Sequence, residues 1–186
     1  MRYHQCFVTA VLIVGLLAPT TSPAFASIST IEVPGATYTS ANGMNDRGDI
    51  VGNYSEGWTY HGFVLHNGTF TTIDVPGTIF TDARGINNRG EIVGRYTLTL
   101  RTFHGFVLDK GTFTSFDVPG ATSTEPSGMN DRGEIVGNFV SGGTGTTHSF
   151  ALDKGTFTTI IDVFAPGINN CGEIVGGTGR YGLVLH

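Results

Sequence analysis

The chain has 186 residues, of which ten are Lys or Arg and fifteen are Asp or Glu, so its formal net charge is −5. Charged residues make up only 13% of the sequence, and no basic run occurs in it. Because phosphate neutralisation needs clustered basic side chains, this composition excludes a nucleic-acid partner. The length suffices for one domain with a substantial core.

The N-terminus has the pattern of a signal peptide over residues 1–26. Met1-Arg2 supplies a short basic start, Phe7 to Leu17 is apolar, and Ala24-Phe25-Ala26 carries the small residues accepted at a cleavage site. A membrane anchor is the alternative, but this apolar run is too short for about 30 Å of hydrocarbon. We therefore expect a secreted, extracellular or periplasmic protein with no membrane span. Residues 27–186 would form one domain, with Cys171 as an exposed, unpaired thiol.

Internal repetition is the strongest signal in the sequence. The phrase Gly-Met-Asn-Asp-Arg-Gly-Asp-Ile-Val-Gly at residues 43–52 recurs, lightly changed, at 85–94, 128–137 and 167–176. A period of about 40 residues with turn signals inside it is typical of propeller blades or of another stacked array.

Each copy is expected to form four short strands. In the second copy these are Asp82 to Asn87, Glu91 to Thr97, Phe103 to Leu108 and Thr112 to Val118. The first and third connections are tight turns that contain a glycine, which favours antiparallel hairpins. The sequence thus predicts a four-stranded meander per copy.

The chain ends favour closure of the array into a ring. The last copy stops at its third strand, Tyr181 to His186, whereas the segment Ser29 to Gly35 resembles the fourth-strand phrase Thr72 to Gly77. An N-terminal strand could therefore complete the last blade and remove the free sheet edges. We expect an all-β, four-bladed β-propeller of four ~41-residue, four-stranded repeats. An open β-repeat array or a barrel is the alternative.

The repeat resembles the bacterial extracellular HAF repeat family, which is named for a His-Ala-Phe triplet that follows an Ile-Asn-x-x-Gly-x-Val-Val-Gly-like phrase. Here the corresponding triplets are His61-Gly62-Phe63, His104-Gly105-Phe106, His148-Ser149-Phe150 and the decayed Tyr181-Gly182-Leu183. The resemblance implies an extracellular or cell-envelope location and a β-rich repeat. It supplies no catalytic residues.

Residues that recur in every copy are expected to serve the repeat, whereas a functional site breaks the symmetry. By this test two sets of carboxylates are structural: Asp49, Glu91, Glu134 and Glu173 after the first turn, and Glu32, Asp74, Asp117 and Asp162 next to the Val at the end of the fourth strand. His61, His104 and His148 could converge on a metal with Tyr181. The alternative is that each imidazole hydrogen-bonds a neighbouring strand. We favour that alternative and expect no metal or other cofactor.

The connections that vary between copies are expected to share one face of the molecule, where function tends to reside. Aromatic residues and arginines there are typical anchors for a sugar ring or a peptide. The candidate ligand-binding residues are Tyr38, Trp58, Tyr60, Phe80, Arg84 and Arg101. For Trp58, capping of a blade edge is the alternative.

These observations favour a secreted, non-catalytic binding module of the envelope or exterior, with a surface glycan or protein as ligand. The alternatives are a small propeller hydrolase or lyase acting on polysaccharide, and a purely structural envelope component. The sequence contains no Ser-His-Asp order and no asymmetric carboxylate pair beyond Glu56 and Asp82, so we do not expect an enzyme. The oligomeric state is left open.

Overall fold

The computed structural model describes residues 29–99, 101–160, 164–178 and 180–186. The chain divides into two units, residues 1–30 and 31–186, and all described strands lie in the second unit. The predicted signal peptide and Asp162 lie outside the described residues. Within the described ranges no helix is long and apolar enough to cross a membrane.

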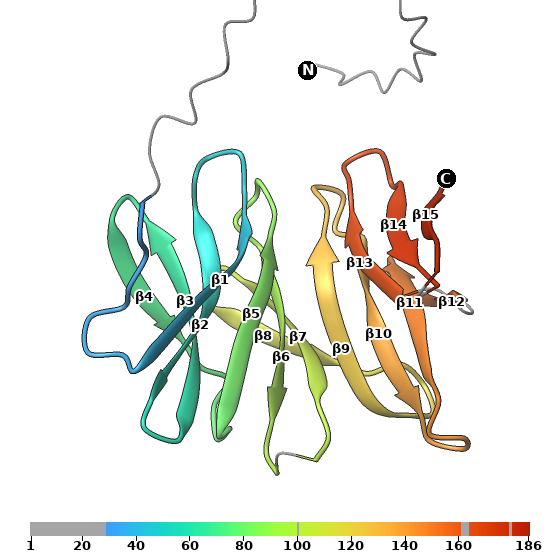
Figure 1. The fold of residues 1–186 in the computed structure, drawn as a ribbon, viewed down its shortest axis with the longest axis horizontal. Coiled ribbons are helices and arrows are strands. Elements are labelled where there is room, and N and C mark those ends of the chain that lie inside the picture. The colour runs from blue at the N-terminus through green and yellow to red at the C-terminus, as the bar shows by residue number, and fades with distance from the viewer. Residues whose placement is uncertain (1–28, 100, 161–163, 179) are drawn as a thin grey trace, which may run out of the picture. The chain divides into compact units, whose positions relative to one another are not determined.

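The described residues form an all-β structure, as the sequence predicts (Figure 1). The strands are β1 (Tyr38–Met44), β2 (Ile50–Glu56), β3 (Thr59–His66), β4 (Thr69–Ile73), β5 (Phe80–Ile86), β6 (Ile92–Thr97), β7 (His104–Asp109), β8 (Thr112–Phe116), β9 (Ala121–Met129), β10 (Ile135–Ser141), β11 (Thr147–Asp153), β12 (Thr156–Ile160), β13 (Phe164–Ile168), β14 (Ile174–Gly177) and β15 (Gly182–Leu185).

Each sequence repeat is one antiparallel meander. The first repeat comprises β1–β4, the second β5–β8, the third β9–β12 and the fourth β13–β15. The predicted meander is confirmed, and the strand bounds predicted for the second repeat agree with β5–β8 to within two residues at each end. The first two repeats join in one sheet through a single parallel pair, Tyr60 with Phe80.

The hairpins are closed by the turns that the sequence indicates. Between β3 and β4, Asn67 and Gly68 have φ values of 48° and 78°. Two consecutive residues with positive φ are characteristic of a type I′ turn, whose twist matches that of the flanking strands. Lys110-Gly111 and Lys154-Gly155 repeat this conformation in the next two repeats.

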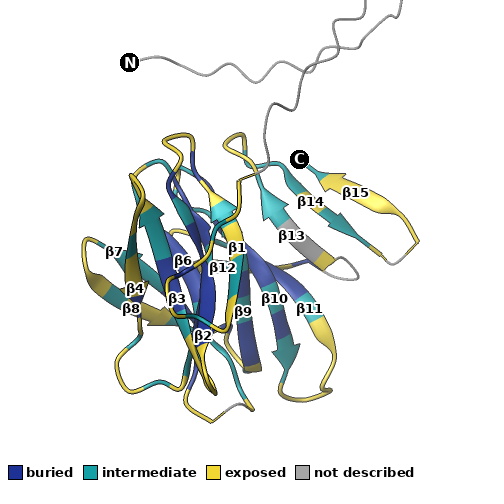
Figure 2. Cartoon of the chain, turned by 60° about the vertical axis from the view of Figure 1, so that its left-hand side comes forward, coloured by how far each residue is buried: buried dark blue, intermediate teal, exposed yellow. Residues whose placement is uncertain are grey.

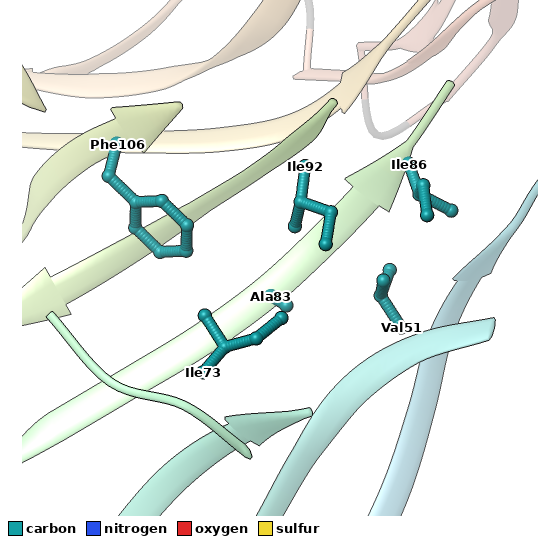
Figure 3. Close-up of a cluster of buried hydrophobic side chains, with 6 residues drawn as sticks. All are labelled: Val51, Ile73, Ala83, Ile86, Ile92 and Phe106. Atoms are coloured by element: carbon teal, nitrogen blue, oxygen red, sulfur yellow. The ribbon is translucent and has the colours of Figure 1, made fainter. Parts of the chain in front are cut away.

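The core lies at the junctions between successive repeats. Figure 3 shows Val51 and Ile73 of the first repeat meeting Ala83, Ile92 and Phe106 of the second. The junction of the second and third repeats has the same design, with Val93 among Ile135, Phe139 and Phe150. A repeat alone would leave this apolar face in water, so each repeat is stabilised by the next.

The N-terminal segment does not have the predicted role. Ser29 to Gly35 forms no strand, and the last sheet consists of β13, β14 and β15. Val33 is instead buried against Tyr54 and Phe63 of the first repeat, and its backbone N–H donates to Thr39 Oγ1 at 3.2 Å.

Val75 and Val118 make the same backbone bond to Thr81 and Thr124, so the phrase around Val33 is the entry connector of a repeat. In the complete repeats the fourth strand runs directly into the connector to the next repeat, so the phrase that ends at Val75 or Val118 covers both. The N-terminal copy of this phrase keeps only the role of the connector. The expectation of a closing N-terminal strand is therefore wrong. The three sheets are separate, and none of them closes on itself.

Candidate functional site

A β-bulge in the first strand of each of the first three repeats aims one residue away from the regular ladder. In β1 the pairing passes from Ala41 to Gly43, so Asn42 is the extra residue. In β5 and β9 the corresponding residues are Arg84 and Ser127. Bulges often redirect a side chain next to a functional site. All three extra residues line one cavity of about 620 Å³.

The residue opposite each bulge has to be glycine. A Cβ on Gly94 would lie 2.2 Å from the carbonyl oxygen of Asp82 and 2.7 Å from the ring of Phe106. Gly52 and Gly137 have equally close neighbours. The recurrent Ile-Val-Gly phrase is therefore a packing requirement of the bulge, and the bulge in turn places the variable residue.

A second cavity, of about 410 Å³, lies beside the 620 Å³ cavity and shares Asn42 and Arg84 with it. We refer to the two together as the central groove. Its smaller part is lined by Tyr38, Ser40, Asn42, Asn53, Tyr60, Phe80, Asp82, Arg84 and Arg95. The larger part is lined by Ala41, Asn42, Arg84, Glu125, Pro126, Ser127, Asn138, Phe139, Val140, Thr147 and Phe164.

A buried carboxylate holds the polar residues of the groove in place. The side chain of Asp82 is almost completely buried and accepts hydrogen bonds from Asn42 Nδ2 at 2.9 Å, Arg84 Nε at 2.6 Å and Arg95 Nε at 3.2 Å. Arg95 also forms an ion pair with Glu125 of the third repeat. Buried charges need such partners because desolvation is costly. The network therefore fixes the groove across three repeats.

Aromatic rings form a wall beside this network. The ring centroids of Tyr60 and Phe80 lie 5.2 Å apart, and the edge-to-face pair of Phe80 with Phe103 has centroids at 5.5 Å. The guanidinium carbon of Arg95 lies 4.5 Å from the Phe103 centroid, within the range of a cation–π contact. Tyr38 and Tyr60 keep part of their ring surface exposed, so they are accessible to a ligand.

Four of the six residues predicted from sequence come together in the groove, namely Tyr38, Tyr60, Phe80 and Arg84. Trp58 and Arg101 do not line it. Trp58 is 99% exposed, so it does not cap a blade edge. Of the carboxylates weighed as a catalytic pair, Asp82 lies buried in the groove, whereas Glu56 is exposed and outside it.

Asn42, Arg95 and Glu125 also belong to the groove network but were not predicted from the sequence. A signal for Asn42 and Glu125 was present in the first strands, where alternate positions behave differently. The positions of Thr39 and Ala41 are nearly constant, whereas the intervening positions read Ser40, Asp82 and Glu125, and then Asn42, Arg84 and Ser127. Strand residues two apart share a face, so variation confined to alternate positions would have identified the groove.

The first hairpin turns of the four repeats form the opposite, recurrent end. In the first three turns the Asn side chain donates through Nδ2 to the backbone carbonyl of the equivalent Asn in the next repeat, at 3.0–3.3 Å. This ladder consists of Asn45, Asn87, Asn130 and Asn169. A parallel ladder of backbone N–H to side-chain oxygen bonds runs through Asp46, Asn88, Asp131 and Asn170.

The acidic residue that ends each turn is structural, as expected. Asn45 Nδ2 donates to Asp49 at 2.8 Å, and the equivalent bonds connect Asn87 to Glu91 and Asn169 to Glu173. Hydrogen bonds from His66, Asn45 and Arg47 lower the pKa of Asp49 to about 2. A hydrogen bond from Arg89 likewise lowers the pKa of Glu91. These groups hold turns rather than transfer protons.

The three histidines of the triplets contact their own repeats. His61 Nδ1 lies 2.9 Å from Asp74 Oδ2, and the His61 ring stacks on Tyr54. His104 Nδ1 lies 2.9 Å from Asp117 Oδ2, and its ring packs against Tyr96 at a tilt. His148 Nε2 lies 2.8 Å from Thr146 Oγ1. The described residues contain no group of three or more His, Cys, Asp or Glu that could hold a metal.

Cys171 occupies the tip of the fourth hairpin turn, where the other repeats have Arg. It is disulfide-bonded in this structure. The expectation of an unpaired thiol concerned the chain after removal of residues 1–26, and it stays a prediction.

No protein-family model matches the chain, and no curated protein is significantly similar to it.

Proposed function

We propose that this protein is a secreted, non-catalytic binding module whose central groove holds a glycan of the cell envelope or exterior. The observation that carries the proposal is the groove itself: an aromatic and arginine-lined cavity built from the positions at which the repeats differ. Exposed faces of Tyr38 and Tyr60 suit stacking against sugar rings, and arginines and amides suit hydroxyl groups.

The charges of the groove favour a neutral ligand. Arg84 and Arg95 are balanced by Asp82 and Glu125, and each of these ionic groups already has a partner. A polyanion would need unpaired basic residues to compensate for its desolvation, and a polycation would need unpaired acidic ones. A neutral oligosaccharide requires neither and fits a cavity with both polar and aromatic walls. A protein segment is the other ligand class to test.

The arrangement of carboxylates argues for binding rather than hydrolysis. The two oxygens of Asp82 are occupied by Asn42, Arg84 and Arg95, and Glu125 is occupied by Arg95. A glycosidase needs two carboxyl groups that reach the scissile bond from opposite sides. Here one guanidinium links both, so they position arginines. A polysaccharide hydrolase or lyase is therefore the weaker alternative, and turnover of any polysaccharide by the purified protein would establish it.

We also propose membership of the extracellular HAF repeat family and, with it, export from a bacterial cell. The support is the sequence repeat and its triplets, together with the N-terminal signal-peptide pattern. We further propose that the four meanders are arranged like propeller blades around a shared axis, in an array that is open between the first and the fourth repeat. The equivalent turns of all four repeats line one cavity of about 260 Å³, as blades around a shared axis would.

The binding proposal is tested by titrating neutral oligosaccharides, charged polysaccharides and peptides into the protein by calorimetry. We expect binding of a neutral oligosaccharide that Tyr60→Ala weakens by at least about tenfold, the loss of one aromatic contact. Leu98→Ala is the matched control, because Leu98 is exposed and outside the groove. Binding that is confined to charged polymers, or that survives in Tyr60→Ala, would contradict the proposal.

A further inference from the structure

One interface recurs at each junction of the array, and the fourth repeat carries half of it without a partner. Val51, Val93 and Val136 occupy the same position in the second strands of the first three repeats and are completely buried. The equivalent residue of the fourth repeat, Val175, is 47% exposed. Figure 2 shows the contrast between the largely buried β6 and β10 and their equivalent in the fourth repeat, β14, which has no buried residue.

The other half of the interface is bare on the first repeat. In the second repeat, Ile86 and Ile92 are buried against Val51 of the preceding repeat. Their equivalents in the first repeat are Met44, which is 68% exposed, and Ile50, which is only half-buried. The entry connector around Val33 packs against Phe63 of the first repeat but leaves Met44 exposed to solvent.

The hydrogen-bond ladders are also incomplete at both ends in a complementary way. Asn169 Nδ2 donates to Glu173 but, among the described residues, lacks the next carbonyl that Asn45, Asn87 and Asn130 reach. At the first repeat, Asp46 Oδ1 accepts no hydrogen bond from a backbone N–H of the described residues. The equivalent atom of the third repeat, Asp131 Oδ1, accepts a hydrogen bond from the backbone N–H of Asn88 at 2.8 Å. Donors are left at one end and acceptors at the other.

We propose that the first repeat of a second copy of this chain packs on the fourth repeat, head to tail. The new junction would be a further instance of the interface already present between successive repeats, with Met44 of one copy on Val175 of the other. A single copy leaves both halves exposed, so the partner that fits each half is the opposite end of another copy. Such a contact is heterologous, and it closes into a ring or extends into a filament.

One difference makes this junction weaker than those inside the chain. Arg89 and Arg132 extend from their turns to the backbone carbonyls of Asp131 and Asn170 in the next repeat. The fourth turn has Cys171 at this position and supplies no such donor. We therefore expect association that depends on protein concentration rather than a permanent assembly.

The test is analytical ultracentrifugation of the purified protein over a range of concentrations, with Met44→Glu and Val175→Glu. Because both residues are exposed in one copy, neither variant should lose its thermal unfolding transition. The wild type is expected to form species of two or more chains, and each variant alone should sediment as one chain. Leu98→Glu, an equally exposed apolar-to-acidic change outside both faces, should associate like the wild type.

Mixing the two variants distinguishes head-to-tail packing from any other dimer. Each variant retains one intact half, so an equimolar mixture should form dimers that neither variant forms alone. A wild type that is a single chain at every concentration would overturn the proposal. Association that both variants retain would also overturn it. If the wild type is a single chain and Val175→Glu lowers its melting temperature, the two ends close on each other within one chain, and the second copy is excluded.

Discussion

The two ends of each repeat differ in what the repetition preserves. At the hairpin-turn end, the same Asn, Gly and carboxylate recur in all four repeats. The Asn side chain bonds to the carboxylate of its own turn and, in the first three repeats, to the backbone of its counterpart in the next repeat. At the groove end, equivalent positions carry Asn42, Arg84 and Ser127, which face one cavity. The comparison indicates that recurrence marks residues that hold the array together, whereas variation marks residues that line the groove.

The largest effect on stability is expected at the recurrent glycine opposite each bulge, because this conserved position of the repeat holds the bulge that places a variable groove residue. Gly94→Ala should lower the free energy of unfolding by about 3 kcal/mol, because its Cβ would clash with the Asp82 carbonyl and the Phe106 ring. Gly143→Ala is the control, since a Cβ there meets nothing within 4 Å. Urea unfolding measures both. Equal stability of the two variants would show that the bulge tolerates a side chain.

The Asn ladder should contribute less, and unequally along its length. Asn87→Ala removes bonds to Glu91 and to the Asn130 carbonyl from a buried site, so we expect a loss of about 2 kcal/mol. Asn169→Ala, at the exposed end of the ladder, should cost less than about 1 kcal/mol. If the two losses are equal, the contacts between turns do not contribute and only the local turn matters.

Acid should destabilise the turn end through Asp49. Its pKa is lowered from 3.8 to about 2 in the folded chain, so its contribution to stability is present above pH 4 and is lost as the pH falls toward 2. Asp49→Asn should therefore be less stable at neutral pH and lose less of its stability across that interval. Thermal melts from pH 5 to pH 2 provide the measurement. Parallel pH curves for both proteins would rule Asp49 out.

The smallest effect on stability is expected at Trp58. Its ring is almost fully exposed, so Trp58→Ala should change the free energy of unfolding by no more than about 0.5 kcal/mol. Because Trp58 does not line the groove, this variant should weaken glycan binding less than Tyr60→Ala does. Calorimetry compares the two. A greater loss of binding in Trp58→Ala would place the ligand at the loop rather than in the groove.

Much of the fold followed from the sequence because the repeat is nearly regular. The strands of the second repeat and the Asn67-Gly68 turn were predictable from β-propensity and turn chemistry. The closing strand failed because Ser29 to Gly35 shares its phrase with a connector as well as with a strand, and Val33 packs on Phe63. The similarity of Ser29 to Gly35 to the other copies of the phrase does not show whether this segment forms a fourth strand or a connector.

The site was predictable only in part, because variable loops indicate a binding surface whereas the groove is lined largely by strand residues. Tyr60 and Phe80 were predicted because they lie in or beside the variable connections, and in the structure their ring centroids are 5.2 Å apart. Arg95 and Glu125 come from different repeats, and their contact depends on how those repeats pack. Long-range contacts of this kind have no local signature, although the alternating variation in the first strands indicates which face they share.

The most direct measurement is an NMR titration of isotope-labelled protein with the neutral oligosaccharide that binds best in the calorimetric screen. Chemical-shift changes should concentrate on groove residues such as Asn42, Tyr60 and Arg84, while Asn45, Asn87 and Asn130 at the turn end stay unchanged. Shifts centred on the turns, or on no common surface, would contradict the assignment of the groove as the binding site.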